Sequence, residues 1–191
     1  IVNATPDSFS DGGAYDGVAQ ARLLVAAGAD ILDIGGESTR PGAAEVSTGD
    51  EIDRIRPVIA ALSHAAPISV DTRKSAVARA AVAAGAGLIN DVSGFDFDPA
   101  LAAFVAESGL PVCVMHAQGV PATMQDNPRY DDVLLDVYDA LAARVARAEA
   151  AGIARDRIIV DPGIGFGKTR AHNLAILNRI GLFHDLGCAI L

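Results

Sequence analysis

Short runs of Ile, Leu and Val alternate along the chain with longer stretches in which apolar residues recur every three or four positions. The short runs predict buried β-strands, and the longer stretches predict amphipathic helices. The predicted strands cover residues 1–4, 30–35, 68–71, 87–91, 111–116, 158–161 and 188–191. The predicted helices cover residues 16–27, 49–64, 75–84, 98–108, 131–151 and 171–184. Strands that alternate with helices from end to end indicate an α/β fold built on a parallel sheet.

Local signals support several of these elements. The run Thr48-Gly49-Asp50-Glu51 predicts a capping box that opens the second helix, with Thr48 as its N-cap. Pro57 lies inside the helical pattern, so we expect it to bend the helix or shift its start. The segments "AAGADILDI" and "AAGAGLIND" repeat one unit, in which a helix ends at a glycine and a buried strand follows.

Most of the predicted strands end in a polar side chain. These side chains are Asn3, Asp33, Asp71, Asn90 with Asp91, His116 and Asp161. In an open parallel sheet, only the strands beside the switch point need polar ends, whereas all strands of a barrel converge on one mouth. The pattern therefore favours a (β/α)8, or TIM, barrel over a doubly wound sheet. Because the chain ends in its seventh predicted strand, we expect residues 1–191 to form one barrel domain that is incomplete at both ends and lacks the C-terminal βα unit.

A group of Asp and Asn side chains, with no lysine expected to be fixed beside it, allows three kinds of chemistry. It could bind a metal ion, act in acid–base catalysis, or accept hydrogen bonds from a heterocycle rich in donors. Magnesium sites usually combine one or two carboxylates with phosphates of the substrate. A carboxylate can also accept two hydrogen bonds at once, from an amino group and an adjacent ring N–H. A single aspartate at a strand end is often a cap or turn former, and Asp33 fits that structural role.

The segment "IIVDPGIGFGKT", residues 158–169, resembles a phosphate-binding loop at first sight. That motif requires a glycine, four spacer residues and then Gly-Lys-Ser/Thr. Pro162 stands where the first glycine should be, and proline has no N–H to offer a phosphate. The spacing therefore argues against a P-loop.

The overall charge narrows the range of partners. The formal net charge is −9, the calculated pI is 4.7 and the mean hydropathy is +0.31. An acidic globular chain of this kind disfavours nucleic acid and anionic membranes as partners. We expect no membrane span, because no apolar run reaches about 18 residues. Cys113 and Cys188 lie in apolar runs without metal-ligand spacing, which predicts reduced core residues and a cytoplasmic protein.

Two predicted loops are long enough to suggest a function. They are "NATPDSFSDGG", residues 3–13, and "GGESTRPGAAEVSTGD", residues 35–50. The second carries Ser38, Thr39 and Arg40, whose hydroxyl and guanidinium groups can bind an anion.

The chain resembles the dihydropteroate synthases, a family of pterin-binding enzymes. The segments "NATPDSFSDGG", "GGESTRPGA", "SVDTRKS", "LINDVSG", "VCVMHAQGVPATMQ" and "DPGIGFGKT" match motifs of that family in order. The resemblance implies a (β/α)8 barrel that joins 4-aminobenzoate to 6-hydroxymethyl-7,8-dihydropterin diphosphate. The products are 7,8-dihydropteroate and diphosphate, and the reaction requires Mg2+.

The resemblance also implies roles for individual residues. Residues implied to bind the pterin are Asp71, Asn90 and Asp161 at its polar edge, with Met115 packed near the ring. Asn3 is implied to help hold Mg2+ and the diphosphate, and Thr39 and Arg40 are implied to lie near the leaving group and the aminobenzoate. Residues implied to close around the aminobenzoate are Phe9, Asp11, Pro41 and Phe166. Asn3, Asp11, Thr39 and Arg40 are the candidate catalytic residues.

In such a reaction the diphosphate leaves first and the arylamine then attacks, so no protein nucleophile is needed. His116 is therefore expected to be a structural residue at a strand end rather than a catalytic base. The resemblance further implies a homodimer when full length, and a Ser-Arg-Lys and an Arg-x-His segment beyond Leu191. Two alternatives remain open at this point. One is a pterin-dependent methyltransferase that supplies a corrinoid partner, and the other is a barrel that binds pterin without turnover.

Overall fold

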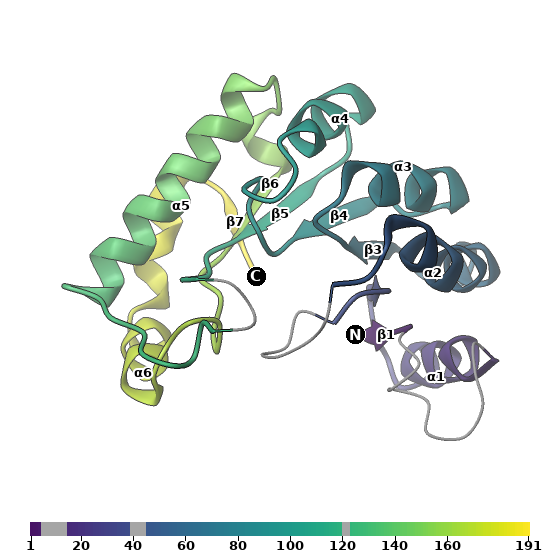
Figure 1. Cartoon of the computed structure of the whole chain (residues 1–191), viewed down its shortest axis with the longest axis horizontal. Coiled ribbons are helices and arrows are strands. Elements are labelled where there is room, and N and C mark those ends of the chain that lie inside the picture. Colours follow the sequence, from purple (N-terminus) through teal and green to yellow (C-terminus); the bar gives the residue numbers. More distant parts are fainter. Residues whose placement is uncertain (5–14, 39–44, 120–122) are drawn as a thin grey trace. The chain divides into compact units, whose positions relative to one another are not determined.

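The computed structural model describes residues 1–4, 15–38, 45–119 and 123–191 (Figure 1). The chain divides into two compact units, whose described residues lie within 1–90 and 91–191. Seven strands alternate with helices along the described residues, and paired strands within each unit run parallel. The predicted α/β class is therefore confirmed.

The first unit contains β1 to β4 and the three helices between them. Their bounds are β1 Val2–Asn3, α1 Tyr15–Ala26, β2 Leu32–Gly35, α2 Thr48–Leu62, β3 Ile68–Asp71, α3 Ser75–Ala84 and β4 Leu88–Asp91, whose last residue belongs to the second unit. Strand β2 pairs with β1 and β3, and β3 pairs with β4. Alternate strand residues such as Ile34, Val70 and Ile89 are fully buried. They form the core of the unit, and the residues between them belong to the other face of the strands.

Helix α2 begins one residue away from the predicted cap. Ser47, not Thr48, is the N-cap: its backbone is extended, and its hydroxyl accepts a hydrogen bond from the N–H of Asp50 at 3.1 Å. Thr48 is already the first helical residue, so its side chain does not have the geometry of a cap. The helix continues through Pro57 to Leu62, and Pro57 does not shift its start.

The end of α3 matches the predicted repeat. Gly85 caps the helix with φ +117°, and its N–H donates to the carbonyls of Ala81 and Val82. A Cβ atom at this position would lie 2.7 Å from the Cβ of Ser63. Gly85 therefore permits both the left-handed turn and the close approach of the end of α2.

The second unit contains the remaining elements. Their bounds are α4 Ala100–Ser108, β5 Val112–Met115, α5 Val133–Ala150, a 3-10 turn Arg155–Arg157, β6 Ile158–Asp161, α6 Arg170–Asn178, a 3-10 helix Ile180–Leu186 and β7 Ala189–Ile190. Strand β6 pairs with β5 and β7. Phe95, Leu141 and Phe183 are among the largest fully buried side chains.

The predicted helix over 171–184 is wrong in its second half. Helix α6 ends at Asn178, because Arg179 adopts φ −128° and leaves the helical region. The N–H of Leu182 then donates to the carbonyl of Arg179 in the tighter 3-10 pattern. Gly181, a poor helix former, lies in this stretch.

Cys113 and Cys188 are buried and form no disulfide bond, as expected of reduced core residues. Within the described ranges, none of the helices combines the length and apolar character that a membrane crossing requires.

Candidate functional site

The strand ends of the first unit bring three predicted site residues into one layer. The register aligns Asn3 with Gly35, Gly35 with Asp71, and Asp71 with Asn90. Gly35 leaves room for its neighbour, since a Cβ atom there would lie 3.4 Å from both Cβ and Oδ2 of Asp71. Three oxygen-bearing side chains thus come from the ends of three strands, two of them adjacent, because parallel strands in register end at a common edge.

Asp33 belongs to the layer directly below. It is aligned with Ser69 on β3, which is in turn aligned with Leu88 on β4. The Nδ2 of Asn90 donates a hydrogen bond to the Oδ2 of Asp33 at 3.2 Å. Asp33 therefore contacts a predicted site residue and is neither a helix cap nor a turn former.

A buried ionic cluster lies next to this layer. The Nζ of Lys74 donates to Glu51 Oε2 at 2.8 Å, to Glu37 Oε2 at 3.1 Å and to the carbonyl of Val46 at 2.6 Å. Thr72, the residue after Asp71, donates its hydroxyl to the other oxygen of Glu51 at 2.7 Å. The cluster thus ties Glu37 and Val46, which precede and follow residues 39–44 in the chain, to the end of β3.

The charges in this cluster support one another. Burial alone would raise the pKa of Glu37, but hydrogen bonds from Val46 and Lys74 and the charge of Arg73 hold that pKa below its ordinary value. Burial alone would lower the pKa of Lys74, but the hydrogen bonds and charges of Glu51 and Glu37 raise it. The lysine and Glu37 therefore remain ionised. Sequence reasoning missed this cluster, because its members are separated by up to 37 positions.

In the second unit, Asp161 ends β6 beside Met115 at the end of β5. Its Oδ1 accepts a hydrogen bond from the N–H of Gly163 at 2.7 Å, and its carbonyl accepts one from the N–H of His116 at 2.8 Å. Burial raises the pKa of Asp161, while the bond from Gly163 and the charge of Lys168 oppose that rise. Met115 is buried, and its carbonyl accepts from Nη1 of Arg144 at 2.6 Å.

Lys168 is fixed at the ends of these two strands. Its Nζ donates to the carbonyls of Gly163 at 2.8 Å, Phe166 at 3.0 Å and His116 at 3.2 Å, and lies 2.9 Å from His116 Nδ1. The side chain is buried, with 3% of the residue exposed. The expectation that no lysine is fixed beside the polar strand ends is therefore wrong. A lysine in a glycine-rich loop is expected to face solvent. Here, however, main-chain carbonyls of the same loop accept hydrogen bonds from the Nζ of Lys168.

The pair formed by Lys168 and His116 has shifted protonation equilibria. Burial lowers the pKa of Lys168 to about 7, although the nearby charge of Asp161 opposes the shift. Burial and the charges of Lys168 and Arg144 lower the pKa of His116 to about 3. The imidazole is therefore neutral at pH 7, so its Nδ1 can accept a hydrogen bond from the ammonium. This arrangement agrees with a structural His116, and it keeps Lys168 turned towards the protein's own carbonyls rather than towards a phosphate.

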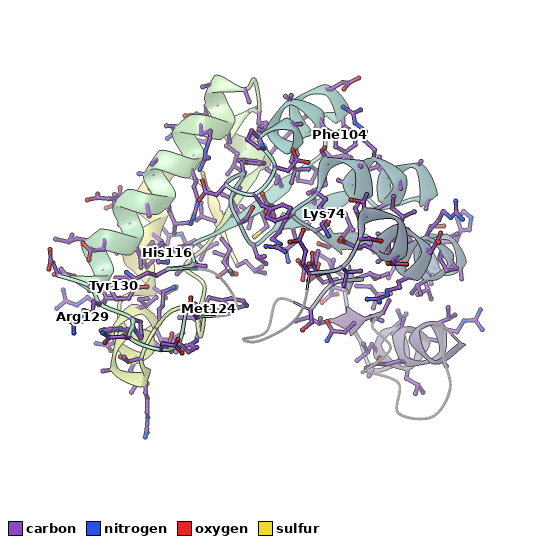
Figure 2. The ribbon with its side chains drawn as sticks, viewed as in Figure 1. Lys74, Phe104, His116, Met124, Arg129 and Tyr130 are labelled. Carbon is purple, nitrogen blue, oxygen red and sulfur yellow. The ribbon has the colours of Figure 1, made fainter. Side chains whose placement is uncertain are left out.

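The loop after β6 is also held by the segment that follows β5 (Figure 2). The hydroxyl of Tyr130 donates to the carbonyl of Gly167 at 2.7 Å, and the Tyr130 and His116 rings lie 6.1 Å apart. Gly163 and Gly167 both have positive φ, and a Cβ atom at either position would collide with a main-chain oxygen, of His116 and Gln118 respectively. Phe166 is half-buried in this loop. The backbone of the loop that contains Phe166 is therefore held in place by these contacts.

Several predicted residues lie outside the described ranges. They are Phe9, Asp11, Thr39, Arg40 and Pro41. Among the residues that the structure describes, no group of three or more His, Cys, Asp and Glu side chains could hold a metal ion. Among the described residues, the expected magnesium site therefore has one predicted protein ligand, the side-chain oxygen of Asn3 at the end of β1.

The sequence and fold are similar to those of known proteins. A family model described as "Pterin binding enzyme" matches residues 1–191. The dihydropteroate synthase of Escherichia coli K12 is 49% identical over 197 aligned positions, which cover 100% of this chain and 70% of that protein. The dihydropteroate synthase of a Synechocystis species is 43% identical and is covered over 68% of its length.

Solved structures show the same relationship. The structure of Xanthomonas albilineans dihydropteroate synthase with 4-aminobenzoic acid has a TM-score of 0.93 at 47% identity, with 100% of this chain and 69% of that chain covered. The enzyme of the same organism in complex with 7,8-dihydropteroate has a TM-score of 0.88 at 43% identity, over 100% and 69% of the two chains. The fold is therefore that of the (β/α)8 barrel proteins, as predicted.

Proposed function

The chain belongs to the pterin-binding enzyme family, and from that premise we propose how its residues act in the reaction of the dihydropteroate synthases. That reaction joins 6-hydroxymethyl-7,8-dihydropterin diphosphate to 4-aminobenzoate and releases diphosphate, so the chain is a transferase. The relatives named above are synthases, and none of them favours a methyltransferase or a barrel without turnover. The observation that carries the assignment of roles is the single layer formed by Asn3, Asp71 and Asn90 at the ends of β1, β3 and β4.

Asp71 and Asn90 are proposed to bind the polar edge of the pterin. This edge carries an amino group beside a ring nitrogen, and a carboxylate can accept hydrogen bonds from both. Each such charge-assisted bond contributes about 1.5–3 kcal/mol. The proposal extends to Asp161 on the basis of the family motif "DPGIGFGKT". Met115 and Phe166, at the end of β5 and in the loop after β6, would pack against the flat faces of the substrates.

Asn3 is proposed to hold Mg2+ together with the diphosphate. A carboxamide oxygen is a ligand of the hard type that Mg2+ prefers, and the ion usually takes only one or two protein oxygens besides phosphates and waters. A single asparagine at a strand end therefore fits a metal that arrives with its substrate. When bound there, Mg2+ would neutralise part of the diphosphate charge.

The remaining chemistry is proposed to be electrostatic. The Arg40 guanidinium and the Thr39 hydroxyl would donate hydrogen bonds to the diphosphate as negative charge develops on it. The amine of 4-aminobenzoate then attacks the exocyclic carbon of the pterin, while Phe9, Asp11 and Pro41 exclude water around it. No residue needs to act as a nucleophile, and the Nδ1 of His116 is already occupied by Lys168. We further propose a cytoplasmic location and a homodimer for the whole protein.

The test of this function is the substitution Asp71→Ala. It removes a carboxylate that would accept two hydrogen bonds, so we expect the affinity for 6-hydroxymethyl-7,8-dihydropterin diphosphate to fall about 100-fold. The affinity is measured by titration calorimetry on the whole protein, with circular dichroism as the check of folding. The matched control is Asp53→Ala, which removes an exposed aspartate of α2. If the affinity of the Asp71 variant is within threefold of that of the unchanged protein, the proposal is wrong.

A further inference from the structure

The side-chain amide of Asn90 can be presented to a ligand in two ways. Its Oδ1 accepts hydrogen bonds and its Nδ2 donates them, and rotation about the last bond exchanges the two ends. Here the Nδ2 donates to Asp33 Oδ2 at 3.2 Å, from β4 across the intervening strand β3 to β2. An ionised carboxylate only accepts hydrogen bonds, so it can hold only the Nδ2 end of the amide. Asp33 thereby determines that Oδ1 is the end left for a ligand.

Asp33 occupies this position at the expense of stability. Its second oxygen, Oδ1, is buried and has no hydrogen-bond partner among the described residues. The hydroxyl of Ser69, aligned with Asp33 in the same layer, is in the same condition within the described ranges. Buried polar atoms without partners destabilise the folded state, and a native protein that keeps one commonly does so for function.

We propose that Asp33 is a positioning residue for pterin recognition, which orients the Asn90 amide so that its oxygen faces the N–H donors of the pterin. The inference rests on the proposed function, because it takes Asn90 to bind the pterin. It adds a residue that acts through Asn90 and that determines which hydrogen-bonding pattern the site accepts. A ring edge rich in donors is accepted, and an edge that presents acceptors at the same place is rejected.

The first experiment replaces Asp33 by asparagine. The carboxamide introduced by Asp33→Asn can donate as well as accept, so it allows the Asn90 amide to turn round and present Nδ2 to the ligand. We expect the affinity for 6-hydroxymethylpterin, a probe without diphosphate, to fall about tenfold, as one hydrogen bond is lost or reversed. The urea midpoint of unfolding should stay the same or rise, because the charged carboxylate, whose Oδ1 is buried without a partner among the described residues, is replaced by a neutral amide. A purely structural residue would lower both quantities together.

Two further variants make the test specific. Ser69→Ala removes the other unpartnered polar atom of the layer without touching Asn90, and its pterin affinity should stay within twofold of the unchanged protein. The exchange of Asp33→Asn together with Asn90→Asp rebuilds the pair with donor and acceptor reversed. Because the carboxylate placed on β4 by this exchange would present an oxygen to the ligand, the double variant should bind the probe more tightly than either single variant.

The outcomes separate the two proposals. If the unchanged protein does not bind 6-hydroxymethylpterin, the proposed function fails. If it binds, but Asp33→Asn binds within twofold of it, the orienting role of Asp33 is refuted. The role is refuted as well if the exchange variant binds more weakly than both single variants, or if Ser69→Ala loses as much affinity as Asp33→Asn.

Discussion

The two buried lysines of the chain are held by different kinds of partner. Lys74 contacts two carboxylates, which keep it charged, whereas Lys168 contacts three main-chain carbonyls and an imidazole. Carbonyl dipoles compensate a buried charge less than a carboxylate does, and this agrees with the opposite directions of the two pKa shifts. Replacement of each lysine should therefore have different consequences.

Lys74→Met should lower the free energy of unfolding by about 3–5 kcal/mol, because it leaves Glu51 buried without its counter-ion and leaves Glu37 with Arg73 as its remaining cationic partner. Chemical denaturation at pH 7 measures the change. Further replacement of both glutamates by Gln removes the uncompensated charge and should restore much of the loss. If the triple variant is no more stable than Lys74→Met, the cluster does not depend on charge balance.

The stability of the protein should fall in acid through His116. Its folded pKa is about 3 and its ordinary value is 6.5, so the unfolded chain binds the proton more tightly. The contribution of neutral His116 is complete above pH 6.5 and is lost as pH falls from 6.5 towards 3, by about 1.4 kcal/mol per pH unit. We expect His116→Gln to remove this part of the slope between about pH 6.5 and 5, measured by urea unfolding. The control His184→Gln removes an exposed histidine and should keep the slope.

The individual partners of these residues could not be predicted from the sequence. Lys168 and His116 are 52 positions apart, and Asn90 and Asp33 are 57 apart. Hydrophobic periodicity indicates which face of a strand is buried, but it does not tell which polar groups on that face will meet. For this reason Asp71, Asn90 and Asp161 could be selected as strand ends, whereas the orienting contact of Asp33 and the burial of Lys168 could not.

At the scale of elements, agreement between sequence and structure is closest where local and long-range forces coincide. Strands β3 and β6 and helix α3 begin and end at the predicted residues. Strand β6 has a continuous apolar run, β3 has apolar residues at alternate positions, and α3 is rich in alanine; each strand ends at an aspartate and the helix ends at a glycine. The start of α2 was missed by one position, because Ser47 and Thr48 are both good caps and only the backbone angles distinguish them.

The N-cap of α2 gives a direct test of that distinction. Ser47→Ala should lower the free energy of unfolding by about 1 kcal/mol, because the N–H of Asp50 loses its acceptor. Thr48→Ala should change it by less than about 0.5 kcal/mol, because Thr48 is the first helical residue. The comparison uses urea unfolding of the two variants under identical conditions. A larger loss in Thr48→Ala than in Ser47→Ala would place the cap at Thr48, as the sequence predicted it.

At the scale of the whole molecule, six motifs in order predicted both the barrel and the reaction. Five of the predicted site residues lie outside the described ranges and belong to the two long connections after β1 and β2. They are Phe9, Asp11, Thr39, Arg40 and Pro41. Connections of this kind lack periodicity, so their sequence indicates a function without indicating a conformation. The proposed roles of these residues accordingly rest on the family resemblance.

The proposed role of Asn3 in holding Mg2+ can be tested in turnover by the whole protein. Asn3→Ala should raise the Mg2+ concentration for half-maximal diphosphate release about tenfold, because a protein ligand is lost. Binding of 6-hydroxymethylpterin, which carries no diphosphate, should be unaffected. Asn178→Ala, at the exposed end of α6, serves as the control. If Asn3→Ala needs the same Mg2+ concentration as the unchanged protein, Asn3 is not a ligand of the metal ion.

The contacts of Lys168 determine which residues of the loop after β6 can be substituted without loss of the fold. Its ammonium binds main-chain oxygens of Gly163, Phe166 and His116, and these oxygens are present whatever side chain a residue carries. Ile164, which is 39% exposed, and Phe166 can therefore be exchanged by mutation while the scaffold beneath them keeps its shape. A library randomised at these two positions should yield mostly folded proteins, and the changes at Phe166, which is proposed to contact the substrates, should alter ligand preference. One randomised at Gly163 and Gly167 should yield mostly misfolded ones.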